Sequence, residues 1–204
     1  MPCPTLVIFD MDDVLCHYDL GKRLRFLANI ADTTARDVRA ALWDSGFEGD
    51  SDAGEYPDPE IYLAEFAKRL RFDLTREQWL EARREAMTPN EEVLDIARAI
   101  KPDVTLAIYT NNGPLVKQHL DVLLPDATAI FDLHFCSYEF GTKKPDPESF
   151  TRLVNSLNRK PEDCWFIDDK KSNVQGARLA GLQAHHFRHA NILADEAQAL
   201  GFRV

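Results

Sequence analysis

The chain has 204 residues, of which 45% are hydrophobic and 28% are charged, and its formal net charge at pH 7 is −10. These proportions are typical of a folded globular protein and argue against a disordered chain. The acidic excess argues against a general nucleic-acid binder and against binding to anionic membranes. We therefore expect neither a nucleic-acid nor a membrane partner, whereas a small anionic substrate in a locally positive pocket is compatible with this charge.

The cysteine spacing and the N-terminal segment favour a cytoplasmic protein. None of the four cysteines, Cys3, Cys16, Cys136 and Cys164, lies in C-x-x-C spacing, so we expect reduced thiols and not a zinc or redox site. The N-terminus lacks the basic segment of a signal peptide, and no stretch approaches the roughly 20 apolar residues of a membrane span. These features predict a cytoplasmic location.

Short apolar runs alternate with helical patterns along most of the chain. Strands are predicted at residues 6–9, 104–109, 131–136, 164–167 and 183–187, and helices at residues 91–100, 114–123, 147–157, 173–180 and 191–200. Apolar runs of this length are typical of strands that are buried on both faces. The alternation predicts an α/β fold in which a doubly wound parallel sheet is covered by helices on both faces.

Residues 16–89 interrupt this alternation. Helical patterns are predicted at residues 22–31, 34–43, 59–70 and 76–87, with residues 46–57 as a polar loop and with no strand in the segment. A crossover between parallel strands needs only about a dozen residues, so this segment is too long to be one. We expect a small helical cap at residues 16–89, inserted into a core formed by residues 1–15 and 90–204.

Polar side chains follow three of the predicted strands, and a lysine lies in a turn before the fourth strand. In chain order these residues are Asp10, Asp12, Thr110, Asn111, Lys144, Asp168 and Asp169. Because ligands bind beyond the carboxyl ends of strands in open α/β sheets, we expect these side chains around one site. Clustered carboxylates repel unless a cation lies between them, and oxygen ligands suit Mg²⁺. Together with the lysine and the hydroxyl, they predict a site for Mg²⁺ and a phosphate group.

Four segments resemble, in order and spacing, the four motifs of the haloacid dehalogenase superfamily of phosphatases. They are residues 6–15 (LVIFDMDDVL), 108–111 (IYTN), 141–147 (GTKKPDP) and 166–174 (FIDDKKSNV). The helical insert lies between the first and second motifs, where that superfamily has its cap. The resemblance implies a magnesium-dependent phosphatase that hydrolyses a small phosphorylated metabolite, either a sugar phosphate or a nucleoside monophosphate, through an aspartyl-phosphate.

The resemblance also implies roles for the residues that would touch the substrate. Asp10 would attack phosphorus. Asp12 would protonate the leaving oxygen and later activate water, which calls for a raised pKa. Thr110 and Asn111 would bind phosphoryl oxygens, and Lys144 would neutralise charge on the nucleophile and the phosphate.

A set of ligands for Mg²⁺ follows from the same resemblance. Asp10, the backbone carbonyl of Asp12 and one of the two acids Asp168 and Asp169 would hold the ion. We prefer Asp169 as the direct ligand because it lies four residues before Asn173, the spacing usual in the superfamily. Asp168 and Asn173 would then support this arrangement.

Several other polar residues are expected to lie outside the site. Asp13 stands where the motif usually has a small or amide residue, and we expect it to point to solvent, the alternative being that it tunes the metal. His185 and His186 are adjacent in a predicted strand and therefore point to opposite faces, so with His189 they are not expected to bind one metal ion. His17 is expected to be a linker residue.

The cap carries residues with two possible uses. Trp43, Phe47, Tyr56 and Tyr62 are expected to fill its interior, the alternative being that Trp43, Phe47 or Tyr56 lines the substrate pocket. The acidic stretch at residues 48–55 is expected to be solvated. Lys143, beside Lys144 in the core, is also expected to be solvated.

Two rival functions stay open beside the phosphatase. A phosphomutase would use the same nucleophile and acid but return the phosphoryl group to the substrate. A non-catalytic binding or regulatory protein could share the scaffold, although such proteins usually lose the nucleophile, and here Asp10 is present. Dehalogenation is disfavoured because the haloacid dehalogenases proper lack an acid at the position of Asp12.

Overall fold

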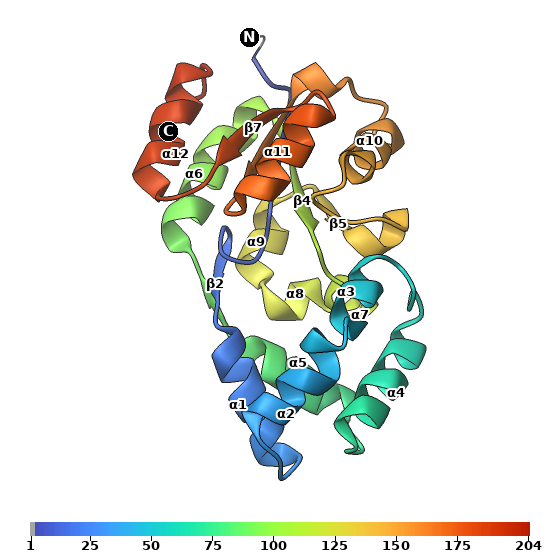
Figure 1. Cartoon of the computed structure of the whole chain (residues 1–204). Coiled ribbons are helices and arrows are strands. Elements are labelled where there is room, and N and C mark those ends of the chain that lie inside the picture. The colour runs from blue at the N-terminus through green and yellow to red at the C-terminus, as the bar shows by residue number, and fades with distance from the viewer. Residues whose placement is uncertain (1–2) are drawn as a thin grey trace.

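The computed structural model of the protein describes residues 3–204, and a five-stranded parallel sheet lies at the centre of its larger part (Figure 1). From one edge to the other the strands are β5 (Leu133–Cys136), β4 (Thr105–Thr110), β1 (Leu6–Phe9), β6 (Cys164–Asp168) and β7 (Gln183–His186). The chain winds outwards from β1 in both directions, so the carboxyl ends of β1, β4 and β6 meet at a topological switch point. The predicted α/β fold with a doubly wound parallel sheet is confirmed.

Helices cover both faces of this sheet. One face carries α6 (Glu91–Ile100), α9 (Pro125–Ile130) and α12 (Ala190–Ala199), and the other carries α10 (Pro147–Ser156) and α11 (Lys171–Leu179). Alternate residues of β1 supply the two interiors, Val7 and Phe9 on the first face and Leu6 and Ile8 on the second. Because both faces are buried, each position of the strand is apolar. Among residues 3–204, no helix combines the length and the apolar character needed to cross a bilayer.

The chain between β4 and β5 is more broken than predicted. The expected helix over residues 114–123 is divided at His119 into α7 (Pro114–Gln118) and α8 (Leu120–Leu123). A further helix, α9, begins at Pro125, so β5 begins two residues later than expected. Leu124 leaves the helical conformation, with φ −145° and ψ 66°, because the proline after it disfavours that conformation. Short 3₁₀ turns lie at η2 (Lys101–Asp103), η3 (Ser137–Phe140) and η4 (Pro161–Asp163).

Residues 16–89, which we call the cap segment, form the end of the molecule that lies beyond the sheet (Figure 1). The helices of the segment are α1 (Leu20–Ile30), α2 (Ala35–Arg39), the π-helical η1 (Ala40–Asp44), α3 (Phe47–Asp52), α4 (Pro59–Leu70) and α5 (Arg76–Glu85). Local capping explains two of their starts: Asp58 accepts from the first turn of α4, and Thr75 and Gln78 form a capping box at α5. That residues 16–89 form a separate cap stays a prediction.

Aromatic rings fill the interior of the cap segment. Phe47 stacks on Tyr62 with ring centroids 5.4 Å apart, and it meets Tyr56 edge-on at 5.1 Å. Tyr62 in turn packs against Trp79 at 6.1 Å, and Trp43 is partly buried against the same cluster. The expectation that the predicted aromatic residues fill this interior is confirmed.

Two expectations for the cap segment are wrong. Residues 46–57 are not a loop throughout, because Gly46 turns the chain with φ 86° and the buried Phe47 then anchors α3. The segment also contains strands, since β2 (Cys16–Tyr18) and β3 (Met87–Pro89) pair antiparallel where the segment enters and leaves the rest of the chain. Strands of three residues are too short to show an alternating pattern, and their pairing joins distant parts of the sequence.

Candidate active site

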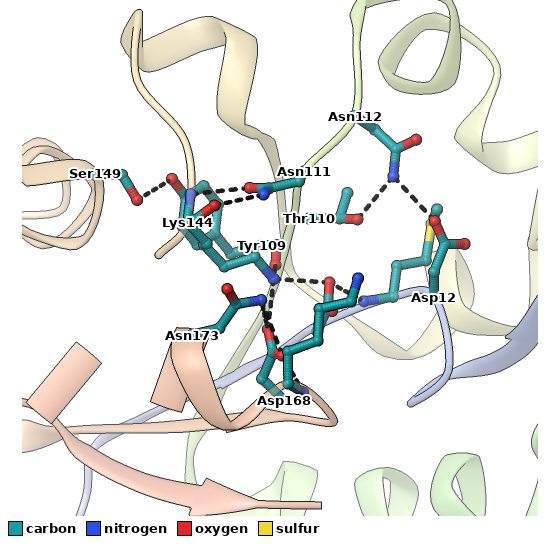
Figure 2. Close-up of polar contacts among 12 residues, drawn as sticks. Asp12, Tyr109, Thr110, Asn111, Asn112, Lys144, Ser149, Asp168 and Asn173 are labelled. Atoms are coloured by element: carbon teal, nitrogen blue, oxygen red, sulfur yellow. Dashed lines mark hydrogen bonds and ion pairs between the residues drawn. The ribbon is translucent and has the colours of Figure 1, made fainter. Parts of the chain in front are cut away.

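Lys144 lies at the centre of a buried polar cluster where the carboxyl ends of the central strands meet (Figure 2). Its Nζ lies 2.8 Å from Oδ1 of Asp10, which follows β1, and 2.7 Å from Oδ2 of Asp168, the last residue of β6. The same Nζ donates to the carbonyl of Tyr109 in β4 at 3.0 Å. One lysine therefore links three strands and brings together the strand-end acids that the sequence singled out.

Burial controls the ionisation of this cluster. It raises the pKa of Asp10 to about 8, and the Lys144 ammonium offsets only part of this effect. Burial also acts to raise the pKa of Asp168, but Lys144 and the hydrogen bonds to this carboxylate hold its pKa below the ordinary value. Burial acts to lower the pKa of Lys144, yet the two carboxylates raise it, so the lysine stays charged. Asp10 needs a further positive charge nearby to be fully ionised at neutral pH.

Three carboxylates here could hold a metal ion. Oxygen atoms of Asp10, Asp168 and Asp169 lie within 4.8 Å of one another. Asp168 is already engaged, because both of its oxygens accept from Nδ2 of Asn173 at 3.0 Å and Oδ1 accepts from the backbone N–H of Lys170 at 2.8 Å. Oδ1 of Asp169 is buried and has no hydrogen-bond partner among residues 3–204. A hard cation such as Mg²⁺ fits this set of oxygen donors.

The second motif is arranged around hydrogen bonds between its own side chains and the neighbouring loop (Figure 2). Nδ2 of Asn112 donates to Oγ1 of Thr110 at 2.8 Å and to Oδ2 of Asp12 at 3.4 Å. Both polar atoms of the Asn111 side chain bind the main chain of Lys144, at 2.8 and 3.0 Å. Asn111 therefore positions the loop that carries the lysine, and its side chain is not free to face a phosphoryl group. Asn112 was assigned no role from the sequence.

Asp12 is held by a residue that the sequence did not single out. Nη2 of Arg83, in α5, lies 2.8 Å from Oδ1 and 2.7 Å from Oδ2 of Asp12. Burial acts to raise the pKa of Asp12, but the Arg83 guanidinium brings this pKa below its ordinary value. The expected raised pKa of Asp12 is therefore wrong for this arrangement. An arginine in a cap helix carries no sequence signal for this contact, because the two residues meet only in the folded chain.

The surroundings of Asp13 and Lys143 decide whether these two residues face solvent, as expected from the sequence. Asp13 is exposed, as expected, and its φ of 63° explains why a small residue is usual at this position. Its Oδ1 accepts from the backbone N–H of Tyr18 at 3.1 Å. The expectation for Lys143 is wrong, because it is only half-exposed and its Nζ donates to the carbonyl of Gly49 in the cap segment at 2.7 Å.

The predicted histidines contact different elements. His185 is buried, and its Nδ1 pairs with Glu196 in α12. Nε2 of His186 lies 2.9 Å from the carbonyl oxygen of Asp169. These two side chains point in different directions, as expected for neighbours in a strand. His17 lies exposed in β2, the connection into the cap segment, in agreement with a linker residue.

Residues 4–181 match the family model of haloacid dehalogenase-like hydrolases. The chain is similar to Phosphatase MT3486 of Mycobacterium tuberculosis, with 25% identity over 189 residues that cover 89% of this chain and 86% of that protein. A segment of 70 residues is 41% identical to Flavin mononucleotide hydrolase 1 of Arabidopsis thaliana, and this match covers 34% of the chain but only 29% of the plant protein.

The fold is also similar to solved structures. A protein described as a HAD-like family hydrolase from Porphyromonas gingivalis aligns with a TM-score of 0.81 at 23% identity, covering 98% of this chain and all of that one. A HAD family enzyme from Bacteroides thetaiotaomicron, solved with magnesium and inorganic phosphate, aligns with a TM-score of 0.76 at 16% identity, covering 91% and 94%. These likenesses concern the fold, whereas the family model matches the sequence itself across most of its length. The chain therefore belongs to the haloacid dehalogenase-like hydrolase family.

Proposed function

We propose that the protein is a magnesium-dependent phosphatase that hydrolyses a small phosphorylated metabolite through an aspartyl-phosphate. The observation that carries this proposal is the cluster of the buried Asp10 and Asp168 and the partly buried Asp169 beside Lys144, since three carboxylates and an ammonium suit a cation together with a phosphate. Two relatives support it: the mycobacterial protein is named a phosphatase, and the Bacteroides enzyme was solved with magnesium and inorganic phosphate. Sugar phosphates and nucleoside monophosphates are the expected substrates.

In this proposal the chain supplies the nucleophile, the acid and the charge on the phosphate site. Asp10 attacks phosphorus while Asp12 protonates the leaving oxygen. Lys144, which contacts Asp10, neutralises charge on the nucleophile and on the transferring group. The Thr110 hydroxyl, held by Asn112, binds a phosphoryl oxygen. Asp12 then takes a proton from water, which hydrolyses the aspartyl-phosphate and regenerates Asp10.

Mg²⁺, when bound, would balance the negative charge of the carboxylates and of the phosphate. Asp10, Asp169 and the backbone carbonyl of Asp12 are the groups that would hold it. Asp169 is preferred to Asp168 as a direct ligand because its Oδ1 has no hydrogen-bond partner within residues 3–204, whereas Asp168 is engaged by Asn173. Asp168 and Asn173 would orient the neighbouring groups.

Arg83 connects the cap segment to this chemistry. Paired with Arg83, Asp12 is ionised, which is the form that activates water in the second step. The first step needs a proton on Asp12, which the contact with Arg83 opposes.

A panel of substrates tests the proposal against its rivals. With Mg²⁺, the purified protein is expected to release phosphate from at least one sugar phosphate, nucleoside monophosphate or phosphoglycolate, and chelation should stop release reversibly. A phosphomutase would require a sugar bisphosphate and would give no net release, and a binding protein would release none. Because a solved dehalogenase also shares the fold, with a TM-score of 0.65, the panel includes a 2-haloacid. Release of halide without phosphate would contradict the proposal.

A further inference from the structure

Asn112 joins the ends of two neighbouring strands of the sheet (Figure 2). The residue lies two positions after Thr110, the last residue of β4, and its amide nitrogen Nδ2 donates to Oγ1 of Thr110 at 2.8 Å. The same nitrogen donates to Oδ2 of Asp12, which follows β1, at 3.4 Å. One amide therefore holds both the hydroxyl proposed to bind the phosphoryl group and the acid proposed to protonate the leaving oxygen.

The cap segment covers this amide. Asn112 is 8% exposed, and the residue after it, Gly113, lies directly against Ser51 of α3. A Cβ atom at Gly113 would collide with Oγ of Ser51, so this close approach needs a residue without a side chain. Because little water reaches the amide, its hydrogen bonds are electrostatically stronger than they would be in water.

The bond to Asn112 fixes the direction in which the Thr110 hydroxyl donates. A hydroxyl has one proton and two lone pairs, and here one lone pair accepts from Nδ2 of Asn112. Thr110 is buried, and its hydroxyl donates no hydrogen bond within residues 3–204. The proton is therefore available for a phosphoryl oxygen. Without the amide, the hydroxyl would be free to rotate and to direct its proton elsewhere.

Asp12 is held by groups from two parts of the chain. Arg83, in the cap segment, donates to both carboxylate oxygens, whereas Asn112 belongs to the core and adds a bond to Oδ2. Since the bonds to Asp12 and to Thr110 come from one nitrogen, Asn112 fixes the acid relative to the hydroxyl. In a phosphate ester these two groups act on different oxygens of one phosphorus atom, so their relative position decides whether both contacts form at once.

We propose that Asn112 is a positioning residue that directs the proton of the Thr110 hydroxyl to a phosphoryl oxygen and holds Asp12 beside the leaving oxygen of the same phosphate. This inference rests on the proposed phosphatase function. Asp10 forms the bond to phosphorus, the bond from phosphorus to the leaving oxygen breaks, and the proton passes from Asp12 to that oxygen. Asn112 gains and loses no atom, and acts only through Thr110 and Asp12.

The effect through Thr110 is measured by the binding of inorganic phosphate in the presence of Mg²⁺. Asn112→Leu removes the donor at nearly constant volume and adds no charge, so the Kd in calorimetry should rise by about tenfold or more. Thr110→Val removes the hydroxyl and should raise this Kd similarly. The double variant should have the same Kd as Thr110→Val alone, because Asn112 acts on phosphate through this hydroxyl.

The effect through Asp12 is measured with two esters that differ in their leaving group. Phenyl phosphate and p-nitrophenyl phosphate have similar shapes, but p-nitrophenolate leaves more readily without a proton. A displaced acid therefore slows phenyl phosphate more, and Asn112→Leu should raise the ratio of kcat/KM for p-nitrophenyl phosphate over phenyl phosphate by about tenfold. Asn155→Leu, exposed on α10, is the matched control and should change neither the Kd nor the ratio.

The outcomes separate this inference from the proposed function. An unchanged ester ratio, or a Kd that rises additively in the double variant, would overturn the inference and leave the phosphatase in place, since a residue that only supports the fold affects both esters alike. If the wild type releases phosphate from other substrates of the panel but from neither aryl ester, the Kd decides alone. A wild type that neither binds inorganic phosphate nor releases it from any substrate would overturn the proposed function itself.

A second variant covers the case in which Asn112→Leu does not fold, as judged by thermal unfolding. Asn112→Asp keeps the shape of the side chain, but its ionised carboxylate has no proton to donate to Thr110 or Asp12. Its ester ratio should also rise by about tenfold, and an unchanged ratio in this variant would likewise overturn the inference.

Discussion

Two buried cations of the molecule have opposite surroundings. One is Lys144 in the strand-end site, which consists of Lys144 and the acids Asp10, Asp168 and Asp169, and the other is Arg23 in the cap segment. Lys144 is 2% exposed and has all of its contacts supplied by the chain, namely two carboxylates and one carbonyl. Arg23 is similarly buried, but rings surround it, and two of its nitrogens have no acceptor in the described part of the chain. The first arrangement satisfies its cation entirely within the chain, as the proposed phosphate site requires. The second leaves two donors without an acceptor among residues 3–204.

The largest effect on activity is expected from replacing Asp10, the proposed nucleophile. Asp10→Asn is expected to lower phosphate release by about 10⁴-fold or more, because the nucleophile is lost. Its fold should survive, since the change removes a buried carboxylate whose pKa is raised by burial and adds no volume. Phosphate release and circular dichroism of the purified variant measure both effects. Undiminished release from pure protein would show that another residue attacks phosphorus.

Replacing Lys144 tests whether its contacts hold the site together. Lys144→Met leaves the carboxylates of Asp10 and Asp168 buried without their cation, and is expected to cost about 3–5 kcal/mol of unfolding free energy in urea denaturation, as well as activity. Lys143→Met is the matched control, because it loses one hydrogen bond to Gly49 and should cost about 1 kcal/mol. Equal costs for the two variants would contradict the distinction between a linking and a peripheral lysine.

Without Mg²⁺, the strand-end site is expected to be sensitive to pH. Burial raises the pKa of Asp10 from 3.8 to about 8, so in this window the folded protein keeps a proton that the unfolded chain has released. The stability of the metal-free protein should therefore fall as pH rises through this window. In the proposed function Mg²⁺ binds the ionised carboxylates, so adding it should raise Tm more at pH 8 than at pH 5.

Two variants check this dependence by thermal unfolding. Asp10→Asn removes the titrating group and should flatten the loss of stability in the metal-free protein. Asp13→Asn, at an exposed position three residues along the chain, should leave it unchanged. Because Asp12 and Asp168 have lowered pKa values and act in the opposite direction, the comparison with the variant decides. The same dependence of stability on pH in Asp10→Asn and in the metal-free wild type would refute the assignment of the raised pKa to Asp10.

The smallest expected effect concerns the contact between Arg83 in the cap segment and Asp12 at the end of β1. Arg83 lowers the pKa of Asp12, so Arg83→Gln should raise that pKa and move the corresponding limb of the kcat/KM profile upward by about one to three pH units. Arg84→Gln, exposed and next along α5, is the control and should leave the profile unchanged. The same profile for both variants would show that Arg83 has no influence on the acid during turnover.

Much of the core could be predicted from the sequence because its signals are local. Apolar runs marked the strands β1, β4 and β6, and Gly181 closes α11 with φ 90°, as a glycine after a helix commonly does. The four cysteines are free, in agreement with the expected thiols, whereas the cytoplasmic location stays a prediction. Strands β2 and β3 were missed because three residues carry too little pattern.

For the candidate site, too, the sequence predicted what depends on local signals and missed what depends on tertiary contacts. The positions of Asp10, Asp12 and Asp169 after strands could be predicted from the sequence, and parallel strands bring their carboxyl ends together in any such sheet. The roles proposed for these residues and for Lys144 come from the resemblance to the family. Side-chain contacts between distant segments decide the rest. They determine that Asn111 binds the loop of Lys144, that Arg83 reaches Asp12, and that Oδ1 of Asp169 has no partner among residues 3–204. Tertiary packing alone placed Arg83 on Asp12 and Arg23 among rings, because no local rule relates the angle of a cap helix to the sheet beneath it.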